Sequence, residues 1–514
     1  MGNVLDWLEA TADRLPDKTA VADPDASLTW GELRARARAA GSWVAAHDGE
    51  PADGGRRAVA LYLEKTPDAL ACMLGAAYAG DFYSVLDVRQ PASRIHAICD
   101  RLDPAVVLTD AANAEAAREA FAGTRWEPVD VSVLLSAPED PAALTARRAA
   151  AIDVDPLYVN FTSGSTGTPK GVVVSQRSVL DFIPVFCRTF GIGEADVLAN
   201  QAPFDFDVSV KDIYSCLLTG AELRIVPRPY FSQPAALMDY LADSGATTLV
   251  WAVSALCFVS IMRGLDYRVP DRVDKVLFSG EVMPPKQLRA WRRALPGATY
   301  VNLYGPTEIT CNCTYQVLED RDYADGEPIP VGRPFPNERV VLLDEGGREV
   351  PPPARGGEPG ELGEICVSGT ALGLGYLGDP GRTAEAFAQS PLNGRWLEPL
   401  YRTGDLGRYG AGGELYYVSR KDFQVKHMGQ RIELGDIEVT AQGVAGVERA
   451  CCVYDARRKK IRLFYQGDID QDGLLARLRD LLPSYMAPAA VRRLDALPLT
   501  KNGKVDRAAL AAMR

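Results

Sequence analysis

Apolar residues along this chain occur in short β-rich runs separated by stretches of helical period. The runs Arg57–Leu63 and Ala105–Thr109 predict buried strands, and Asp68–Ala79 between them predicts a buried helix. The same pattern predicts further buried strands at Leu157–Phe161, Val172–Ser175, Ala199–Ala202, Glu222–Val226, Thr248–Trp251, Lys275–Phe278 and Tyr300–Asn302. Because strands that alternate with helices form layers around largely parallel sheets, the predicted fold class is α/β.

The pattern changes in the second half of the chain. Around Arg339–Leu343 and Gly363–Ser368 the predicted strands come closer together, which indicates a β-rich subdomain. A strand ends near Tyr417–Asp422, and a smaller unit of roughly ninety residues follows it. We therefore predict a large N-terminal domain of layered α/β sheets with that subdomain, residues 1–421, and a small mobile C-terminal α+β domain, residues 422–514.

Composition restricts the partners and the location. The 514 residues are 47% hydrophobic and carry a net charge of −12, so the chain is globular, and an acidic protein gains nothing from neutralising nucleic-acid phosphates. No uncharged apolar stretch reaches the roughly 18–20 residues of a membrane helix, and the N-terminus lacks the features of a signal peptide. Ten cysteines without a CxxC pair are typical of a reducing compartment. We expect a cytoplasmic protein that binds neither nucleic acid nor membrane.

Histidine chemistry is nearly excluded by the sequence. Only His47, His96 and His427 occur, and none has neighbours suited to a metal site or a catalytic triad. We expect catalysis to depend on lysine, carboxylates, backbone amides and a metal ion carried by a nucleotide.

A glycine-rich segment at residues 160–171 lies between two of the predicted strands. Gly164, Gly167 and Gly171 let backbone N–H groups turn toward one anion, and Lys170 adds a positive charge. Hydroxyl donors are supplied by Thr162, Ser163, Ser165, Thr166 and Thr168. The segment is suited to β- and γ-phosphates, although it is not a Walker A loop. A flexible linker is the alternative, but linkers seldom lie between apolar strands or contain Pro-Lys-Gly.

This loop resembles the phosphate loop of the acyl-adenylate-forming superfamily, which includes acyl-CoA ligases, luciferases and the adenylation domains of peptide synthetases. Further motifs similar to that family follow in the family's order: Leu28-Thr29-Trp30 with Glu32-Leu33, Phe206–Ser209, Asn302–Glu308, Gly363-Glu364-Ile365, Tyr401–Asp405, Arg420–Arg431 and Asn502–Arg507. The resemblance covers nearly the whole chain and implies ATP and Mg²⁺ as cofactors.

The segment Tyr304–Glu308 follows a predicted strand and contains a Gly-Pro turn. The resemblance implies that Tyr304 stacks on adenine, that Gly305 and Thr307 contact the nucleotide, and that Glu308 ligates Mg²⁺, a cation that prefers carboxylate and phosphate oxygens. Taken alone, the segment is better explained as a surface turn with a solvated glutamate, and the phosphate loop beside it favours the functional interpretation.

Two further residues are predicted to bind the ribose. Asp405 lies in a Thr-Gly-Asp turn, where a carboxylate can accept both ribose hydroxyls, and Arg420 is a second ribose or phosphate ligand. A purely structural Asx-turn is the alternative for Asp405. Ser419 precedes Arg420 where the family usually has glycine.

The resemblance assigns catalysis to Lys504, Glu308 and Lys170. Carboxylate attack on the α-phosphate builds negative charge, and an ammonium group near the C-terminus, that of Lys504, would stabilise it. Asp422 matches the family's hinge, at which the small domain rotates between the adenylation and thiolation poses.

The second half-reaction needs a thiol that this sequence does not obviously supply. The resemblance therefore implies the phosphopantetheine arm of a carrier, with Lys426 and Gly429 lining its tunnel. Because the sequence ends seven residues beyond Arg507, we expect a separate carrier protein. The basic run Arg457–Lys460 is a candidate docking site for an acidic carrier, and a solvated hairpin turn is at least as good an interpretation.

Asp207 is the main indicator of the substrate. In the amino-acid-activating branch the matching carboxylate pairs with the substrate ammonium, and an unpaired buried carboxylate is costly. A surface aspartate at a strand end is the alternative. The remaining pocket positions carried over from the family are Val208, Lys211, Ala252, Leu277, Ser279, Leu303, Cys311 and Asn312. This mixed set favours alanine, serine or glycine, followed by aspartate-like substrates. Lys211 either pairs with an acidic substrate group or lies outside the pocket.

Several interpretations stay open at this level. Phe278–Val282 and the absence of fused domains are also similar to D-alanine–carrier protein ligases of the cell envelope, whereas freestanding enzymes of this kind also serve natural-product pathways. The sequence is also compatible with an acyl-CoA ligase for a plain carboxylic acid and with an inactive scaffold homologue. The presence of Lys504, Glu308, Lys170 and Asp405 argues against the scaffold.

Overall fold

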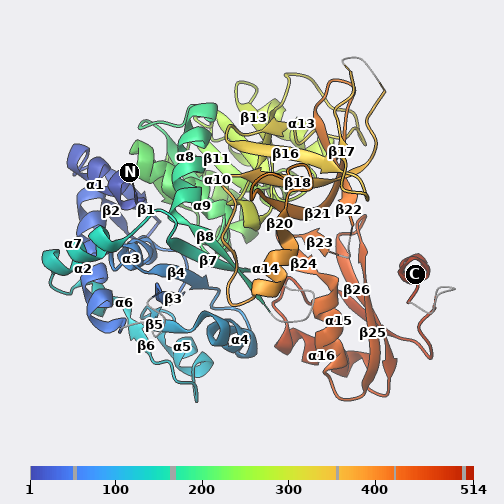
Figure 1. Ribbon diagram of the computed structural model, residues 1–514, viewed down its shortest axis with the longest axis horizontal. Coiled ribbons are helices and arrows are strands. Elements are labelled where there is room, and N and C mark those ends of the chain that lie inside the picture. The colour runs from blue at the N-terminus through green and yellow to red at the C-terminus, as the bar shows by residue number, and fades with distance from the viewer. Residues whose placement is uncertain are drawn as a thin grey trace.

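The strands of the large domain pair into sheets that are stacked with helices between them (Figure 1). The structure is a computed structural model and describes residues 2–49, 55–162, 169–354, 358–421, 424–499 and 505–513. The first sheet has the order β15-β14-β13-β12-β11-β9-β10-β1-β2 and is parallel from β13 to β1. Its strands are β1 (Thr19–Ala22), β2 (Ser27–Thr29), β9 (Val197–Asn200), β10 (Glu222–Ile225), β11 (Thr248–Ala252), β12 (Lys275–Ser279), β13 (Thr299–Tyr304), β14 (Thr314–Val317) and β15 (Arg333–Pro334).

The second sheet has the order β19-β8-β7-β4-β3-β5-β6, and the third has the order β17-β16-β18-β21-β20 with β22 beside β21. The second consists of β3 (Ala58–Tyr62), β4 (Phe82–Leu86), β5 (Pro104–Thr109), β6 (Pro128–Asp130), β7 (Pro156–Thr162), β8 (Lys170–Ser175) and β19 (Gly375–Tyr376). The third consists of β16 (Glu338–Leu343), β17 (Glu349–Val350), β18 (Gly363–Gly369), β20 (Phe387–Gln389), β21 (Pro399–Tyr409) and β22 (Leu415–Arg420). The third sheet is antiparallel throughout its pairs and forms the β-rich part of the large domain that the sequence predicted.

Helices cover the sheets of the large domain. They are α1 (Leu5–Arg14), α2 (Trp30–His47), α3 (Pro67–Tyr78), α4 (Ala92–Leu102), α5 (Ala114–Ala120), α6 (Val131–Leu135), α7 (Pro141–Ala150), α8 (Gln176–Phe190), α9 (Val208–Thr219), η1 (Arg228–Ser232), α10 (Pro234–Asp243), α11 (Val253–Ile261), α12 (Gly264–Tyr267), α13 (Pro285–Ala294), η2 (Thr307–Ile309) and α14 (Pro380–Ala386). Apolar side chains of α2, α3, α8 and α9 share one core with residues of the first and second sheets, so these helices form the layer between the sheets.

The motif at the start of α2 is explained by local chemistry. Thr29 Oγ1 accepts a hydrogen bond from the Glu32 amide at 3.2 Å, and the Glu32 carboxylate accepts one from the Thr29 amide at 2.8 Å. This reciprocal capping box satisfies two donors that the first turn of a helix would otherwise leave unpaired. The sequence match at Leu28–Leu33 therefore marks a helix start rather than a ligand contact.

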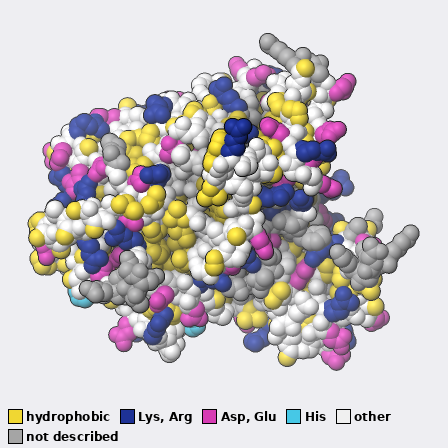
Figure 2. All heavy atoms as spheres, in the orientation of Figure 1, with side chains coloured by type: hydrophobic (Ala, Val, Ile, Leu, Met, Phe, Trp, Pro, Cys, Tyr) yellow, Lys and Arg dark blue, Asp and Glu magenta, His cyan; other side chains and the backbone are white. Residues whose placement is uncertain are grey.

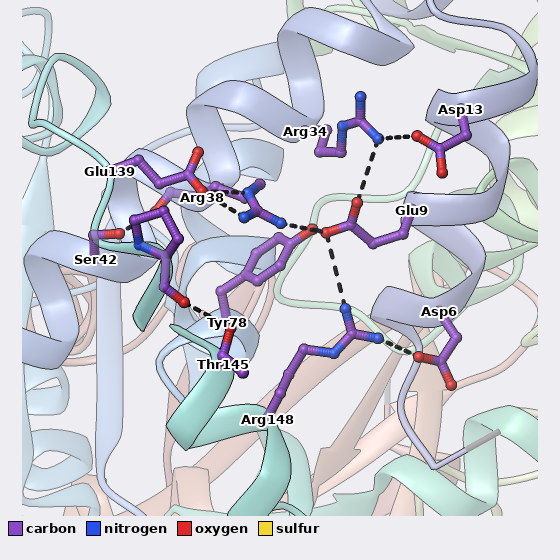
Figure 3. Close-up of polar contacts among 11 residues, drawn as sticks. Asp6, Glu9, Asp13, Arg34, Arg38, Ser42, Tyr78, Glu139, Thr145 and Arg148 are labelled. Atoms are coloured by element: carbon purple, nitrogen blue, oxygen red, sulfur yellow. Dashed lines mark hydrogen bonds and ion pairs between the residues drawn. The ribbon is translucent and has the colours of Figure 1, made fainter. Parts of the chain in front are cut away.

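An ion-pair network joins the N-terminal helices to one another (Figure 3). Glu9 on α1 accepts hydrogen bonds from Tyr78 Oη at 2.6 Å and from Arg38 at 2.8 Å, and Arg34 lies 3.3 Å away. Burial disfavours the charged form of Glu9, but these hydrogen bonds outweigh that effect and lower its pKa. Because Glu9, Arg38 and Tyr78 lie on α1, α2 and α3, the network fixes the relative position of the three helices.

The predicted strands match the observed ones closely, except at the end of β9. The run Ala199–Ala202 was expected to be extended throughout, whereas β9 ends at Asn200. The ammonium group of Lys65 explains this, because it binds the carbonyl oxygens of Asn200 at 2.9 Å and Gln201 at 2.8 Å. The Asn200 carbonyl also accepts the Val226 amide at 3.0 Å beside β10, whereas the Gln201 carbonyl, one residue beyond the strand, points toward the cation.

The small domain consists of a hairpin, a sheet and helices on both faces of that sheet. Its elements are β23 (Gln424–His427), β24 (Gln430–Glu433), α15 (Leu434–Gln442), β25 (Val447–Asp455), β26 (Lys460–Gly467), α16 (Gln471–Leu481), β27 (Ala490–Arg493) and α17 (Arg507–Ala512). Ile432 of the hairpin shares a core with Cys452 and with helices α15 and α16. Leu510 of α17 instead packs with Cys451, on the opposite face of β25. Figure 1 accordingly places α17 on the outer side of β25 and β26.

Glu338 on β16 is a buried carboxylate with an incomplete set of partners. One oxygen accepts the Ala371 amide at 3.0 Å, and the other has no hydrogen-bond partner among the residues that the structure describes. Burial raises the pKa of Glu338 from 4.5 to about 8, so the folded protein holds a proton there at neutral pH.

We expect Glu338→Gln to stabilise the protein increasingly as the pH rises. Between pH 4.5 and about 8 the unfolded chain has lost this proton and the folded chain keeps it, so wild-type stability falls with rising pH across that window. Glutamine stays neutral, so the variant does not lose this stability. The free energy of unfolding of the variant should therefore exceed that of wild type by up to about 1.4 kcal/mol more for each pH unit. Thermal unfolding from pH 5 to pH 8.5 measures the difference. Glu349→Gln, at an exposed position on β17, is the control. The prediction would be contradicted if the difference in stability from wild type were independent of pH for both variants.

Candidate functional site

The main candidate pocket lies where β7, β12 and β13 end, beside the start of α9, and the β23–β24 hairpin contributes one wall. Predicted residues that line it are Thr162, Asp207, Val208, Ser279, Gly305, Thr307, Cys311, Asn312, Asp405, Arg420, Lys426 and Gly429. Gly305 is required at this turn, because a Cβ there would lie 2.5 Å from the Asn312 Cα atom. The pocket therefore brings together residues that the sequence separates by more than 260 positions.

The amino-acid end of the pocket is formed by Asp207 and the segment that faces it. Asp207 immediately precedes α9, and burial raises the pKa of its carboxyl group. A hydrogen bond with Thr307 and the charge of Lys211 partly offset that rise. Cys311 has a positive φ of 94° and donates a thiol hydrogen bond to the Asp207 carbonyl oxygen at 3.1 Å. This hydrogen bond links the strained backbone at Cys311 to the start of α9.

Lys211 lies behind the pocket rather than in it. The side chain is fully buried, and its Nζ atom donates to Asn312 Oδ1 at 2.6 Å. Asn312 itself lines the pocket, so Lys211 acts on the pocket through its hydrogen bond to this amide. Of the two alternatives from the sequence, the geometry favours a lysine outside the pocket that orients a pocket residue.

Three more of the expected pocket residues lie elsewhere. Leu277 is buried in the core between the first two sheets, and Leu303 lines a neighbouring cavity together with Tyr304. Ala252 ends β11 and approaches the hairpin, where a Cβ on Gly429 would lie 3.3 Å from the Ala252 Cβ atom. In this pose these side chains do not contact the part of the pocket beside Asp207.

The predicted ribose and adenine residues form one connected group. Tyr304 Oη donates to one oxygen of Asp405 at 2.5 Å, and Arg420 donates to the other at 2.9 Å. The ammonium group of Lys426 lies 5.3 Å from the centre of the Tyr304 ring and 5.6 Å from that of Tyr417. Asp405 is thus held in place by the two side chains that the sequence assigned to the same nucleotide.

Glu308 lies at the centre of a buried charge cluster. Its side chain has no exposed surface; Tyr376 Oη donates to its Oε1 atom at 2.8 Å, and Lys170 Nζ lies 3.4 Å from the same oxygen. Arg431 of the hairpin binds the other oxygen at 3.0 Å. Burial opposes ionisation, but the charges of Arg431 and Lys170 outweigh it and hold the pKa of Glu308 far below its ordinary value.

Donors suited to phosphate lie near this cluster. Thr162 ends β7, and its buried Oγ1 atom has no hydrogen-bond partner among the described residues. The predicted loop residues Ser163, Gly164, Ser165, Thr166, Gly167 and Thr168 lie outside the described residues. An unpaired hydroxyl, the Lys170 ammonium and a buried carboxylate fit a nucleotide phosphate with its divalent metal ion, for which Glu308 supplies the oxygen ligand.

The hairpin of the small domain is held against the large domain beside the pocket. Glu281 accepts the Gly429 amide at 2.7 Å and the Lys459 ammonium at 2.7 Å. Lys504 lies outside the described residues. Its neighbour Val505 packs against the face of β25 and β26 that is opposite the hairpin. In this pose the small domain lines the pocket with the hairpin and with Tyr485, whereas Val505 lies on the opposite face of the sheet.

Comparison with known proteins decides the family. Residues 8–377 match the family described as AMP-binding enzyme. The chain belongs to the AMP-binding enzyme family. This AMP-binding enzyme is 30% identical over 522 residues to the D-alanine--D-alanyl carrier protein ligase of Bacillus velezensis, with 98% of each chain covered. It is 32% identical to the L-proline--[L-prolyl-carrier protein] ligase of Streptomyces coelicolor, over 93% of this chain and 91% of the relative.

The solved structures agree on the fold. PA1221, described as a nonribosomal peptide synthetase protein containing adenylation and PCP domains, superimposes with a TM-score of 0.81 at 26% identity, covering 99% of this enzyme and 96% of that chain. These matches confirm the resemblance and the α/β fold with a small C-terminal subdomain. The AMP-binding enzyme is therefore an adenylate-forming ligase that uses ATP.

Further features bear on its location and its surface. Within the described ranges, no helix combines the length and the apolar character needed to cross a membrane. The face in Figure 2 carries interspersed acidic and basic side chains. All ten cysteines fall within the described ranges, and each is free and buried.

Sequence reasoning missed several residues of the site, among them Gln90, Asp205 and Tyr485 of the pocket lining and three that bind site groups. Arg431, Tyr376 and Glu281 each bind a site group from a distant element. Arg431 and Glu281 lie inside segments that the sequence singled out, but nothing in their spacing indicated their partners. Tyr376 carried no signal, because its role depends on β19 pairing with β8.

Proposed function

We propose that this enzyme activates a small amino acid with ATP to an aminoacyl adenylate and transfers it to the phosphopantetheine thiol of a separate carrier protein. The observation that carries this proposal is the half-buried Asp207 at the edge of the pocket, where desolvation raises the pKa of its carboxyl group. A carboxylate in such a place is costly unless a cation pairs with it, and the ammonium group of an amino acid is such a cation. A fatty or aryl acid would leave Asp207 without that partner.

The remaining groups fit the first half-reaction. Asp405 and Arg420 would hold the ribose, and Tyr304 the adenine, while Lys170 and the segment around Thr162 bind the phosphates. Glu308 would hold Mg²⁺, which, when bound, neutralises the charge of the β- and γ-phosphates. The substrate carboxylate attacks the α-phosphorus, the bond to the bridging oxygen breaks, and pyrophosphate leaves with the electron pair. Lys504 stabilises the negative charge that develops in this step.

The second half-reaction fits the pose of the small domain. Lys426 and Gly429 of the hairpin line the pocket, which supports our inference that they border the path of a phosphopantetheine thiol. Because Val505 lies on the opposite face of the same sheet, we infer that the small domain turns about residues near Asp422 to bring Lys504 in for adenylation. The carrier partner is supported by the two relatives whose names contain carrier protein ligase.

We infer that the substrate is an amino acid whose side chain is small and either apolar or weakly polar. Val208, Ser279, Cys311 and Asn312 line the pocket near Asp207, and the turn at Gly305 packs directly against the backbone of Asn312. Alanine, serine and glycine fit such walls. Because Lys211 places a buried positive charge behind Asn312, an aspartate-like substrate is the next candidate.

ATP–pyrophosphate exchange with each proteinogenic amino acid, in both L and D forms, tests the proposal. We expect exchange with one or more of alanine, serine and glycine. Exchange with D-alanine above L-alanine would favour the D-alanine–carrier ligase, a candidate supported by full-length similarity to such an enzyme. Exchange with fatty or aryl acids and with no amino acid would refute the proposal. If no acid supported exchange, the proposal would also fail, and the inactive scaffold homologue would be favoured.

A further inference from the structure

The buried carboxylate of Glu308 is shared between the two domains. Lys170 of β8 and Tyr376 of β19 approach one oxygen from within the large domain. The other oxygen is bound by Arg431, which lies on β24 of the small domain. Arg431 is oriented for this contact, since its Nε atom donates to the Gln424 side chain at 2.7 Å. Both carboxylate oxygens are therefore engaged, and the small domain supplies the partner of one.

Electrostatics makes this arrangement incompatible with a divalent cation. Glu308 contributes one negative charge, while Lys170 and Arg431 contribute two positive charges within 3.4 Å of it. A divalent ion added to this cluster would meet two cationic side chains and an oxygen already bound by Arg431, in a site without exposed carboxylate surface. Conversely, removing the ion would leave a buried carboxylate that needs a new cationic partner.

We propose that Arg431 and the nucleotide-bound metal ion alternate at Glu308, so that loss of the metal with pyrophosphate favours the seated hairpin and the second half-reaction. Arg431 is then a positioning residue, because it acts through Glu308 on the pose of the small domain. Lys170 stays with Glu308 in both states, since both residues belong to the large domain. The inference rests on the proposed metal site at Glu308.

Metal affinity tests the competition directly. We expect Arg431→Met to bind Mn²⁺ in the presence of α,β-methylene-ATP about tenfold more tightly than wild type, measured by electron paramagnetic resonance, because the variant lacks the competing cation. Arg431→Lys should restore affinity toward the wild-type value. Arg493→Met, an exposed arginine of the small domain paired with Asp468, is the matched control and should bind as wild type does. Unchanged or weaker Mn²⁺ binding by Arg431→Met would overturn the proposal.

Hydrogen–deuterium exchange of the unaltered protein gives a second test that needs no variant. Adding Mn²⁺ with α,β-methylene-ATP should increase exchange of peptides that cover residues 424–433, because the hairpin leaves Glu308. The same nucleotide with EDTA should leave those peptides protected. Equal protection in both samples would contradict the alternation, whereas failure of the proposed function would appear separately as an absence of amino-acid-dependent pyrophosphate exchange.

Discussion

Replacing Lys504 with alanine is expected to lower the rate of adenylate formation about 10²-fold or more. The reason is that the attack of a carboxylate on the α-phosphorus concentrates negative charge, and Lys504 is the ammonium group assigned to stabilise it. The fold should survive, because Leu510 and Val505 anchor this end of the chain to the small-domain sheet. Amino-acid-dependent ATP–pyrophosphate exchange measures the effect.

Two controls separate chemistry from structure. Lys501→Ala removes the same charge from the same Thr-Lys-Asn-Gly-Lys segment and should retain exchange. Lys504→Ala should also still transfer an amino acid from synthetic aminoacyl adenylate to a carrier, since that step uses the hairpin pose described here. Exchange within threefold of wild type would refute the assignment of Lys504.

Replacing Asp207 with asparagine is expected to reduce kcat/KM for the amino acid by about 10²- to 10³-fold. Asparagine has nearly the same shape but cannot neutralise the substrate ammonium, which would then be buried without a counter-ion. The amide also keeps a group that can hydrogen-bond to Thr307, so the local structure should persist. The measurement is pyrophosphate exchange as a function of amino-acid concentration.

The corresponding acid without an amino group distinguishes this role from a general loss of structure. For such an acid, the change from Asp207 to asparagine should leave exchange unchanged or raise it, because an unpaired carboxylate no longer opposes binding. If exchange with the amino acid and exchange with its deaminated analogue fell together, pairing with the ammonium would be the wrong explanation for Asp207.

The sequence predicted what depends on local pattern. Buried strands such as β3 and β12 follow from short apolar runs, and the turn at Gly305 follows from its glycine and proline. The grouping of Tyr304, Asp405 and Arg420 came from the family resemblance, and the geometry places these side chains in contact.

Contacts between distant elements could not be predicted in this way. The pairing of Arg431 with Glu308 joins residues 123 positions apart across a domain boundary. The position of Lys211 depends on which side of α9 faces the pocket, and two alternatives fitted the sequence equally well. The division at residue 422 and the functional roles of the site residues stay predictions, and Ser163–Thr168 and Lys504 also lie outside the described residues.

The burial of every thiol has a consequence for an enzyme that makes a reactive acyl phosphate anhydride. Cys311 lines the pocket, yet burial raises its pKa, so its sulfur stays protonated while it donates to the Asp207 carbonyl. A protonated sulfur is a poor nucleophile, and the remaining cysteines are shielded from the pocket by the cores in which they lie. The enzyme's own thiols therefore do not compete with an incoming thiolate for the activated carbonyl.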